Sequence, residues 1–169
     1  MLGEKSPRGE SKTYLNIKDG AIVKHTNNGE ERFSFVDGRL EDITQRERNF
    51  GGEKVRYWYI DLRDTESGEL YSLGFHYSAN TFKSIILQLA SEEGLLAVER
   101  GLTIKIEPYK KNGYDKVQVW SDGNRLGWAE KQLPPVKEVT IGGRVIKDDS
   151  ERMGLITAHA REIRKRVNK

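Results

Sequence analysis

The chain of 169 residues contains no cysteine, which excludes a disulfide framework and thiolate chemistry. It also lacks any apolar run near the roughly 18 residues that a membrane-spanning helix needs. Residues 1–12 are polar and have no apolar stretch of the kind found in signal peptides. From these absences we expect a cytoplasmic protein with a disordered N-terminal tail at residues 1–12.

Sequence motifs typical of enzymes are missing as well. There is no GxGxxG, P-loop or GxSxG motif. The three histidines, His25, His76 and His159, fall on separate segments without the spacing of a metal site. We therefore predict that the protein is not an enzyme, and that it needs no metal and no cofactor.

The positive charge is concentrated at the C-terminal end. The whole chain carries a formal net charge of +3. Residues 151–169 hold six Lys and Arg residues against two Glu residues, a net of +4, so residues 1–150 carry −1. An argument for nucleic-acid binding by the main body must therefore rest on local patches and not on total charge.

What the sequence does contain is an ordered series of strand-like segments around one apolar helix. Apolar residues alternate in three segments, then recur at helical spacing, then alternate again. We predict strands at 33–46, 54–63 and 69–77, a helix at 80–91, and strands at 102–109 and 114–121. Two shorter strands are expected at 14–17 and 21–25, around the turn signal Asp19–Gly20.

A helix between the third and fourth of five strands is the element order of the OB-fold, a small Greek-key barrel. Gly38 interrupts the first strand, where a barrel strand must bend strongly. We predict a mainly β protein, a five-stranded Greek-key OB-type barrel with one helix between strands 3 and 4 and a C-terminal helical extension. The barrel domain is expected at 13–133, and a linker with a basic C-terminal helix at 134–169.

Cationic and aromatic residues coincide in two predicted loops, 45–52 and 109–114, and on the strands beside them. In an OB-fold these two loops flank the ligand groove. Cations match phosphates, and aromatic faces match unstacked bases. The candidate nucleic-acid-binding residues are Arg46, Arg48, Lys105, Lys110, Lys111 and Lys116 together with the aromatic residues Phe50, Tyr57, Tyr59, Tyr109, Tyr114 and Trp120.

Other interpretations of these residues stay open. In one alternative, the rings of Tyr57, Tyr59 and Trp120 pack beneath the chain termini. Trp58 shares the parity of the neighbouring apolar residues Ile60 and Leu62, so we predict that it lies in the core. The basic C-terminal helix has three readings, namely contact with phosphates, a solvated face, or docking of a partner through its sparse apolar positions.

The stretches Arg56–Leu62 and Tyr71–Leu73, with Ile106–Tyr109 and Gly113–Val117, carry a family resemblance. Together with the element order, they make residues 30–130 resemble OB-fold single-stranded DNA-binding proteins of tailed phages and mobile elements. The resemblance implies sequence-tolerant binding of single-stranded DNA in replication or recombination, with RNA as an open alternative. Bacterial proteins of this class have an acidic C-terminal tip that recruits partners, whereas this chain ends in the basic segment Arg164–Lys169.

Two other functions remain as alternatives. The first is a non-enzymatic β-barrel module for protein interaction or structure, of phage origin, with the C-terminal helix as its docking element. The charge of −1 on residues 1–150 favours it. The second is an oligosaccharide-binding module, which would use the same aromatic residues without needing the lysines. A homo-oligomer or a replication partner held by the C-terminal helix is also left open.

Overall fold

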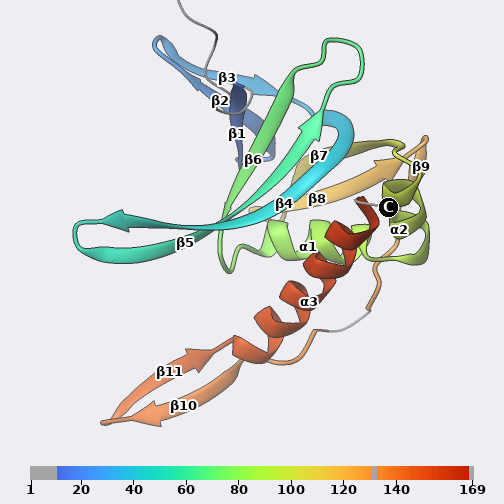
Figure 1. Cartoon of the computed structure of the whole chain (residues 1–169). Coiled ribbons are helices and arrows are strands. Elements are labelled where there is room, and N and C mark those ends of the chain that lie inside the picture. Colours follow the sequence, from blue (N-terminus) through green and yellow to red (C-terminus); the bar gives the residue numbers. More distant parts are fainter. Residues whose placement is uncertain (1–10, 131–132, 168–169) are drawn as a thin grey trace, which may run out of the picture.

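The computed structural model describes residues 11–130 and 133–167, so most of the predicted disordered tail lies outside the described residues. Within these ranges nine strands form one sheet, two more form a separate hairpin, and three helices complete the fold (Figure 1). The predicted mainly β class with a C-terminal helix is therefore confirmed.

Across the sheet the described strands follow the order β3-β2-β1-β6-β5-β4-β7-β8-β9. All neighbours are antiparallel except β1 and β6, which run parallel. The strands are β1 (Lys12–Lys18), β2 (Ala21–Thr26), β3 (Gly29–Phe33), β4 (Val36–Phe50), β5 (Glu53–Arg63), β6 (Leu70–His76), β7 (Thr103–Lys111), β8 (Tyr114–Ser121) and β9 (Asn124–Arg125).

The prediction of a closed five-stranded barrel is wrong for the sheet as described, which is open and has nine strands. The N-terminal strands cause the difference. Strand β1 pairs in parallel with β6, with Lys12 opposite Leu70 and Leu15 opposite Leu73. It takes up the backbone hydrogen-bonding groups on the free side of β6, and β2 and β3 then continue the sheet outward.

The predicted first strand at 33–46 is in fact two strands. Phe33 ends β3, opposite Ile22 of β2, and the long strand β4 begins only at Val36. Phe33 and Phe35 fall in the predicted first strand, and each is 43% exposed. The apolar residues run on through the break into β4, although every residue of β3 is exposed.

Gly38 lies where β4 changes partners. Residues 36–39 pair with β7, and residues from Arg39 onward pair with β5. A Cβ atom at Gly38 would lie 2.6 Å from the carbonyl oxygen of Arg63. The bulge itself comes later, at Glu41, which is the extra residue between the paired positions Leu40 and Asp42. Glycine is thus needed at position 38 for close backbone approach.

We expect Gly38→Ala to lower the free energy of unfolding by about 1–3 kcal/mol, because the new methyl group meets backbone and not a mobile side chain. Urea unfolding followed by circular dichroism measures this effect. Gly154→Ala is the matched control, since a Cβ there meets nothing within 4 Å. In a helix that change should stabilise by up to about 1 kcal/mol. Equal effects at the two positions would contradict the assigned role of Gly38.

Helix α1 (Asn80–Leu89) covers the inner face of the sheet and confirms the predicted helix. Its predicted apolar stripe is buried, with Phe82, Ile85, Ile86 and Leu89 all at 0% exposure. Ala79 occupies the N-cap position, and no side chain caps the helix there.

A second helix, α2 (Glu92–Glu99), was not expected from the sequence. Ser91 caps it by accepting a 3.1 Å hydrogen bond from the backbone N–H of Gly94. A Cβ at Gly94 would lie 2.4 Å from the carbonyl oxygen of Leu89, so glycine permits the sharp corner between α1 and α2. Ser91 followed by two glutamates is a helix-start signal that could have revealed it.

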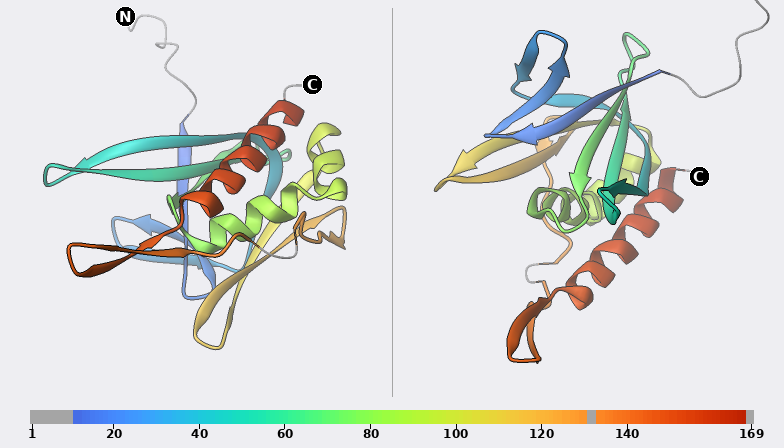
Figure 2. Two further views of the ribbon diagram at one scale, coloured as in Figure 1. Left: turned by 90° about the horizontal axis from the view of Figure 1, so that it is seen from below. Right: turned by 90° about the vertical axis from the view of Figure 1, so that its left-hand side faces the viewer.

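The C-terminal helix α3 (Ser150–Val167) packs against α1, α2 and β4 (Figures 1 and 2). Met153, Ile156, Ala160 and Ile163 are at most 1% exposed and belong to the same core cluster as the sheet and α1. The domain division at residues 133 and 134 stays a prediction. Among the described residues, these apolar side chains of α3 pack against other elements of the same chain.

The segment between the sheet and α3 forms a hairpin of β10 (Lys137–Ile141) and β11 (Arg144–Asp148). Gly142 and Gly143 make its two-residue turn, with φ of 59° and 79°. Such positive values are typical of tight hairpin turns with two glycines. In the described parts of the chain, no helix is both long and apolar enough to cross a membrane.

Candidate nucleic-acid interface

The outer face of β4, β5, β6 and β1 carries a concave surface. Strand β5 turns Trp58, Ile60 and Leu62 to the core, which confirms the predicted burial of Trp58. Tyr57 and Tyr59 point to the opposite face. A groove of about 820 Å³ lies there, and its lining includes Lys12, Tyr14, Lys18, Lys24, His25, Arg48, Tyr57, Tyr59, Gly74 and His76.

Aromatic rings form a row across the strands of this groove. Tyr57 on β5 lies opposite His76 on β6, with ring centroids 5.0 Å apart, and Phe50 on β4 meets Tyr57 at 6.2 Å. Two residues further along β5, the ring of Tyr59 contacts the ring of Tyr14 on β1 edge-on, with the ring centroids 6.2 Å apart. Cross-strand aromatic pairs of this kind stabilise a sheet and hold the rings in place.

Gly74 makes room for one of these rings. It lies opposite Tyr59, and a Cβ at this position would be 3.1 Å from the Tyr59 ring. The tyrosine therefore lies over the backbone of β6 and reaches toward β1. It is only 7% exposed, because Tyr14, Arg46 and Arg48 cover it. Of the predicted base-stacking tyrosines, Tyr59 thus supports its neighbours and offers little face of its own in this conformation.

Two guanidinium groups lie on the tyrosine rings. Arg46 sits 5.6 Å from the centroid of Tyr59, and Arg48 sits 5.6 Å from Tyr59 and 5.8 Å from Tyr57. Cation–π contact orders these long side chains on the sheet face. Within the described residues neither arginine has a carboxylate partner, whereas Lys12 is paired with Asp61 and Lys18 with Glu30. The two arginines are therefore available to an anion.

The remaining predicted residues lie on the β7–β8 hairpin. Cations and aromatic rings face each other across its strands in three pairs: Lys111 with Tyr114, Lys116 with Tyr109, and Lys105 with Trp120. The Trp120 ring has Lys105 5.5 Å and Arg125 5.0 Å from its centroid, and its indole N–H donates to Glu107. Cations already occupy the faces of this indole.

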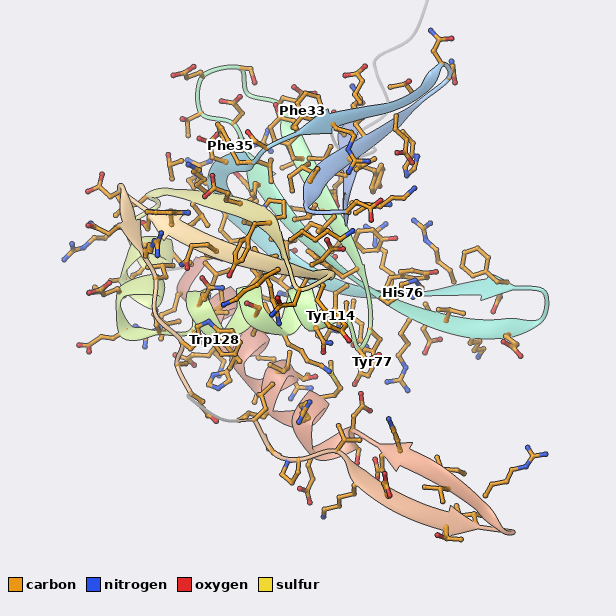
Figure 3. All side chains as sticks on the ribbon, turned by 180° about the vertical axis from the view of Figure 1, so that it is seen from behind. Phe33, Phe35, His76, Tyr77, Tyr114 and Trp128 are labelled. Atoms are coloured by element: carbon orange, nitrogen blue, oxygen red, sulfur yellow. The ribbon has the colours of Figure 1, made fainter. Side chains whose placement is uncertain are left out.

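The tip of the β7–β8 hairpin is tied to the β1–β2 turn. Lys110 Nζ lies 3.1 Å from Asp19 Oδ1, and Asp115 accepts a 2.6 Å hydrogen bond from the backbone N–H of Gly20. The Lys110 ammonium group lowers the pKa of the Asp19 carboxyl. Lys110 is therefore engaged within the chain, while Lys111 and Tyr114 are exposed nearby. Figure 3 labels Tyr114, and also His76 at the root of the β4–β5 hairpin.

The structure thus brings the predicted residues together in two groups. Arg48, Tyr57 and Tyr59 line the groove, and Arg46 and Phe50 contact these two tyrosines beside it. Lys105, Tyr109, Lys111, Tyr114, Lys116 and Trp120 line the β7–β8 hairpin, and Lys110 links its tip to the β1–β2 turn.

Tyr14, Lys18 and Lys24 also belong to the groove but were not singled out in the sequence. The alternation of Tyr14, Asn16 and Lys18 predicts one polar strand face. The parallel pairing that sets this face beside β6, however, joins segments far apart in the chain. Local patterns do not report such a contact.

No group of three or more His, Cys, Asp or Glu side chains placed to hold a metal ion is found among the described residues. Compared with known proteins, the chain matches no protein-family model, no curated protein and no solved structure. The functional argument therefore depends on the geometry of the groove.

Proposed function

We propose that the protein binds single-stranded DNA with little sequence preference, through the groove over β5, β6 and β1. One observation carries the proposal. Arg46 and Arg48 lie on the rings of two tyrosines, and among the described residues neither arginine has a carboxylate partner. The same sheet face also exposes other aromatic rings. Paired cations and stacking surfaces are what a flexible strand of phosphates and unstacked bases requires.

The strand order supports the same proposal. Strands β4, β5 and β6, helix α1, and strands β7 and β8 follow each other as the elements of an OB-fold do. We infer an OB-type core that β1–β3 extend. In that fold the face of the second and third strands receives the ligand. The corresponding strands here are β5 and β6, and they carry Tyr57, Tyr59 and His76.

The exposed rings define where bases would lie. Phe50 is 54% and Tyr14 50% exposed, and they lie on β4 and β1, on either side of Tyr57 and His76. Each stacked base contributes about 1–3 kcal/mol. We infer a role in protecting or presenting single-stranded DNA during replication or recombination. An oligosaccharide would use the rings but leave the arginines without a partner.

Titration with a labelled oligo-dT over a series of salt concentrations tests the proposal. We expect binding whose affinity falls as salt rises. About three phosphate contacts, at Arg46, Arg48 and Lys24, correspond to a logarithmic slope near −2 for a single strand. An oligosaccharide series serves as the control ligand. Absence of DNA binding at about 50 mM salt, or salt-independent binding of the oligosaccharides, would contradict it.

A further inference from the structure

The β10–β11 hairpin, here called the arm, projects from the body of the protein at the start of α3 (Figures 1 and 2). Its two strands pair only with each other in the described structure. Four apolar side chains are largely uncovered: Val139 is 40%, Ile141 61%, Val145 64% and Ile146 47% exposed. The arm thus carries apolar residues that nothing in the described parts of its own chain covers.

The root of the arm is held firmly to the packed helix. Lys137 pairs with Glu151, Asp148 accepts a hydrogen bond from the backbone N–H of Ser150, and Arg152 donates to the carbonyl of Pro134. An isolated two-stranded hairpin is at best marginally stable in water. A fixed root with exposed apolar strands is typical of an element that is completed by another surface.

One face of the arm is more apolar than the other. Val139 and Ile146 are directly opposite each other, and Ile141 lies two residues along on the same face. The other face presents Thr140 opposite Val145, next to the cross-strand pair of Glu138 and Lys147. A stripe of three branched apolar side chains therefore runs along one side only.

A second uncovered apolar surface lies at the far end of the molecule, where β3 ends and β4 begins. It is a hollow of about 370 Å³ whose lining includes Leu15, Ile22, Phe33, Phe35 and Tyr71. Phe33 and Phe35 are each 43% exposed. Figures 1 and 2 show β1–β3 and the arm on opposite sides of the body, so the arm of one copy cannot reach its own hollow.

We propose that the arm of one copy docks in the hollow of a second copy of this chain, with Val139, Ile141 and Ile146 against Phe33 and Phe35. The unpaired edge of β3 is available to extend the sheet by backbone pairing with the arm. Charge also matches, because Arg144 lies opposite Ile141 on the docking face of the arm, while the two carboxylates Asp37 and Glu69 outnumber Lys24 in the lining of the hollow. The proposal does not depend on DNA binding.

A symmetric contact between two arms would explain fewer of the exposed apolar side chains. It would cover the arm residues but leave Phe33 and Phe35 exposed. Docking in the hollow covers both apolar sets at once. Because such a contact joins different surfaces, it repeats from copy to copy and leads to rings or open chains.

Complementation between two variants tests the contact. Val139→Glu disables the arm, and Phe33→Glu disables the hollow. By analytical ultracentrifugation we expect the wild-type protein to show an average mass that grows with concentration above the 19.4 kDa of one chain. Each variant alone should stay monomeric. An equimolar mixture should form a dimer and nothing larger, because only one intact arm and one intact hollow remain per pair.

Thr140→Glu is the matched control, since it places the same charge on the less apolar face of the arm and should associate as the wild type does. Circular dichroism of all variants checks that they fold. A wild-type protein that is monomeric at concentrations on the order of 100 μM would overturn the proposal. So would a mixture of the two variants that fails to associate, because a symmetric arm-to-arm contact cannot be restored in this way.

Discussion

Replacing Arg46 and Arg48 together by alanine is expected to weaken binding of single-stranded DNA by on the order of a hundredfold at about 50 mM salt. Each guanidinium group lost removes one phosphate contact, so the logarithmic salt slope should become shallower by about 1.4. Fluorescence anisotropy of a labelled oligo-dT at several salt concentrations measures both quantities. The loss should fade at high salt, where phosphate contacts contribute little.

The control for this prediction is the double variant Arg100→Ala and Arg161→Ala. It removes the same charge from exposed positions at the C-cap of α2 and on α3, away from the groove. We expect it to change affinity only slightly. An equal loss in the control would mean that overall charge or the basic helix, and not the groove, attracts the DNA.

The second prediction concerns α3. Ile156→Ala should lower the free energy of unfolding by about 2–5 kcal/mol, because the truncated side chain leaves a cavity between packed elements. Ile156 is 0% exposed and belongs to the core shared with α1 and the sheet. Urea unfolding, analysed with a common slope for all variants, measures the change.

Ile141→Ala is the matched control for Ile156→Ala. The same chemical change is made at a position that is 61% exposed on the arm. We expect an effect within about 0.5 kcal/mol there. If the two variants were equally stable, α3 would be a detachable docking element, as one reading of the basic C-terminal segment supposed. A large difference would mean that deleting residues 150–169 damages the fold.

Sequence patterns reported local structure well where neighbouring residues decide it. The alternation around Trp58 and the stripe of Phe82, Ile85, Ile86 and Leu89 predicted which side chains are buried, and the structure confirms both. The same patterns joined Phe33 to the following strand, because alternation does not register the chain break before Val36. They also missed α2, whose amphipathic signal is weak over its eight residues.

The candidate site divides in a similar way. The chemistry of the groove, namely arginines with tyrosines, was visible as residues close in sequence on two successive strands. The cation–π contacts of Arg46 and Arg48 follow from β4 and β5 being one antiparallel hairpin. The part of the groove made by Tyr14 and Lys18 depends on parallel pairing of β1 with β6, between residues more than 50 positions apart.

The sequence alone therefore determined strands β5 to β8 and helix α1, which side chains of β5 and α1 face the core, and which cations and rings share a hairpin. Periodicity and short-range pairing settle these features. Tertiary structure decided that β1 covers the free side of β6, so that the sheet is open with nine strands, and that α3 completes the core. It also decided that the arm stands uncovered. Each of these outcomes depends on which distant surfaces bury each other best, and no local pattern encodes that competition.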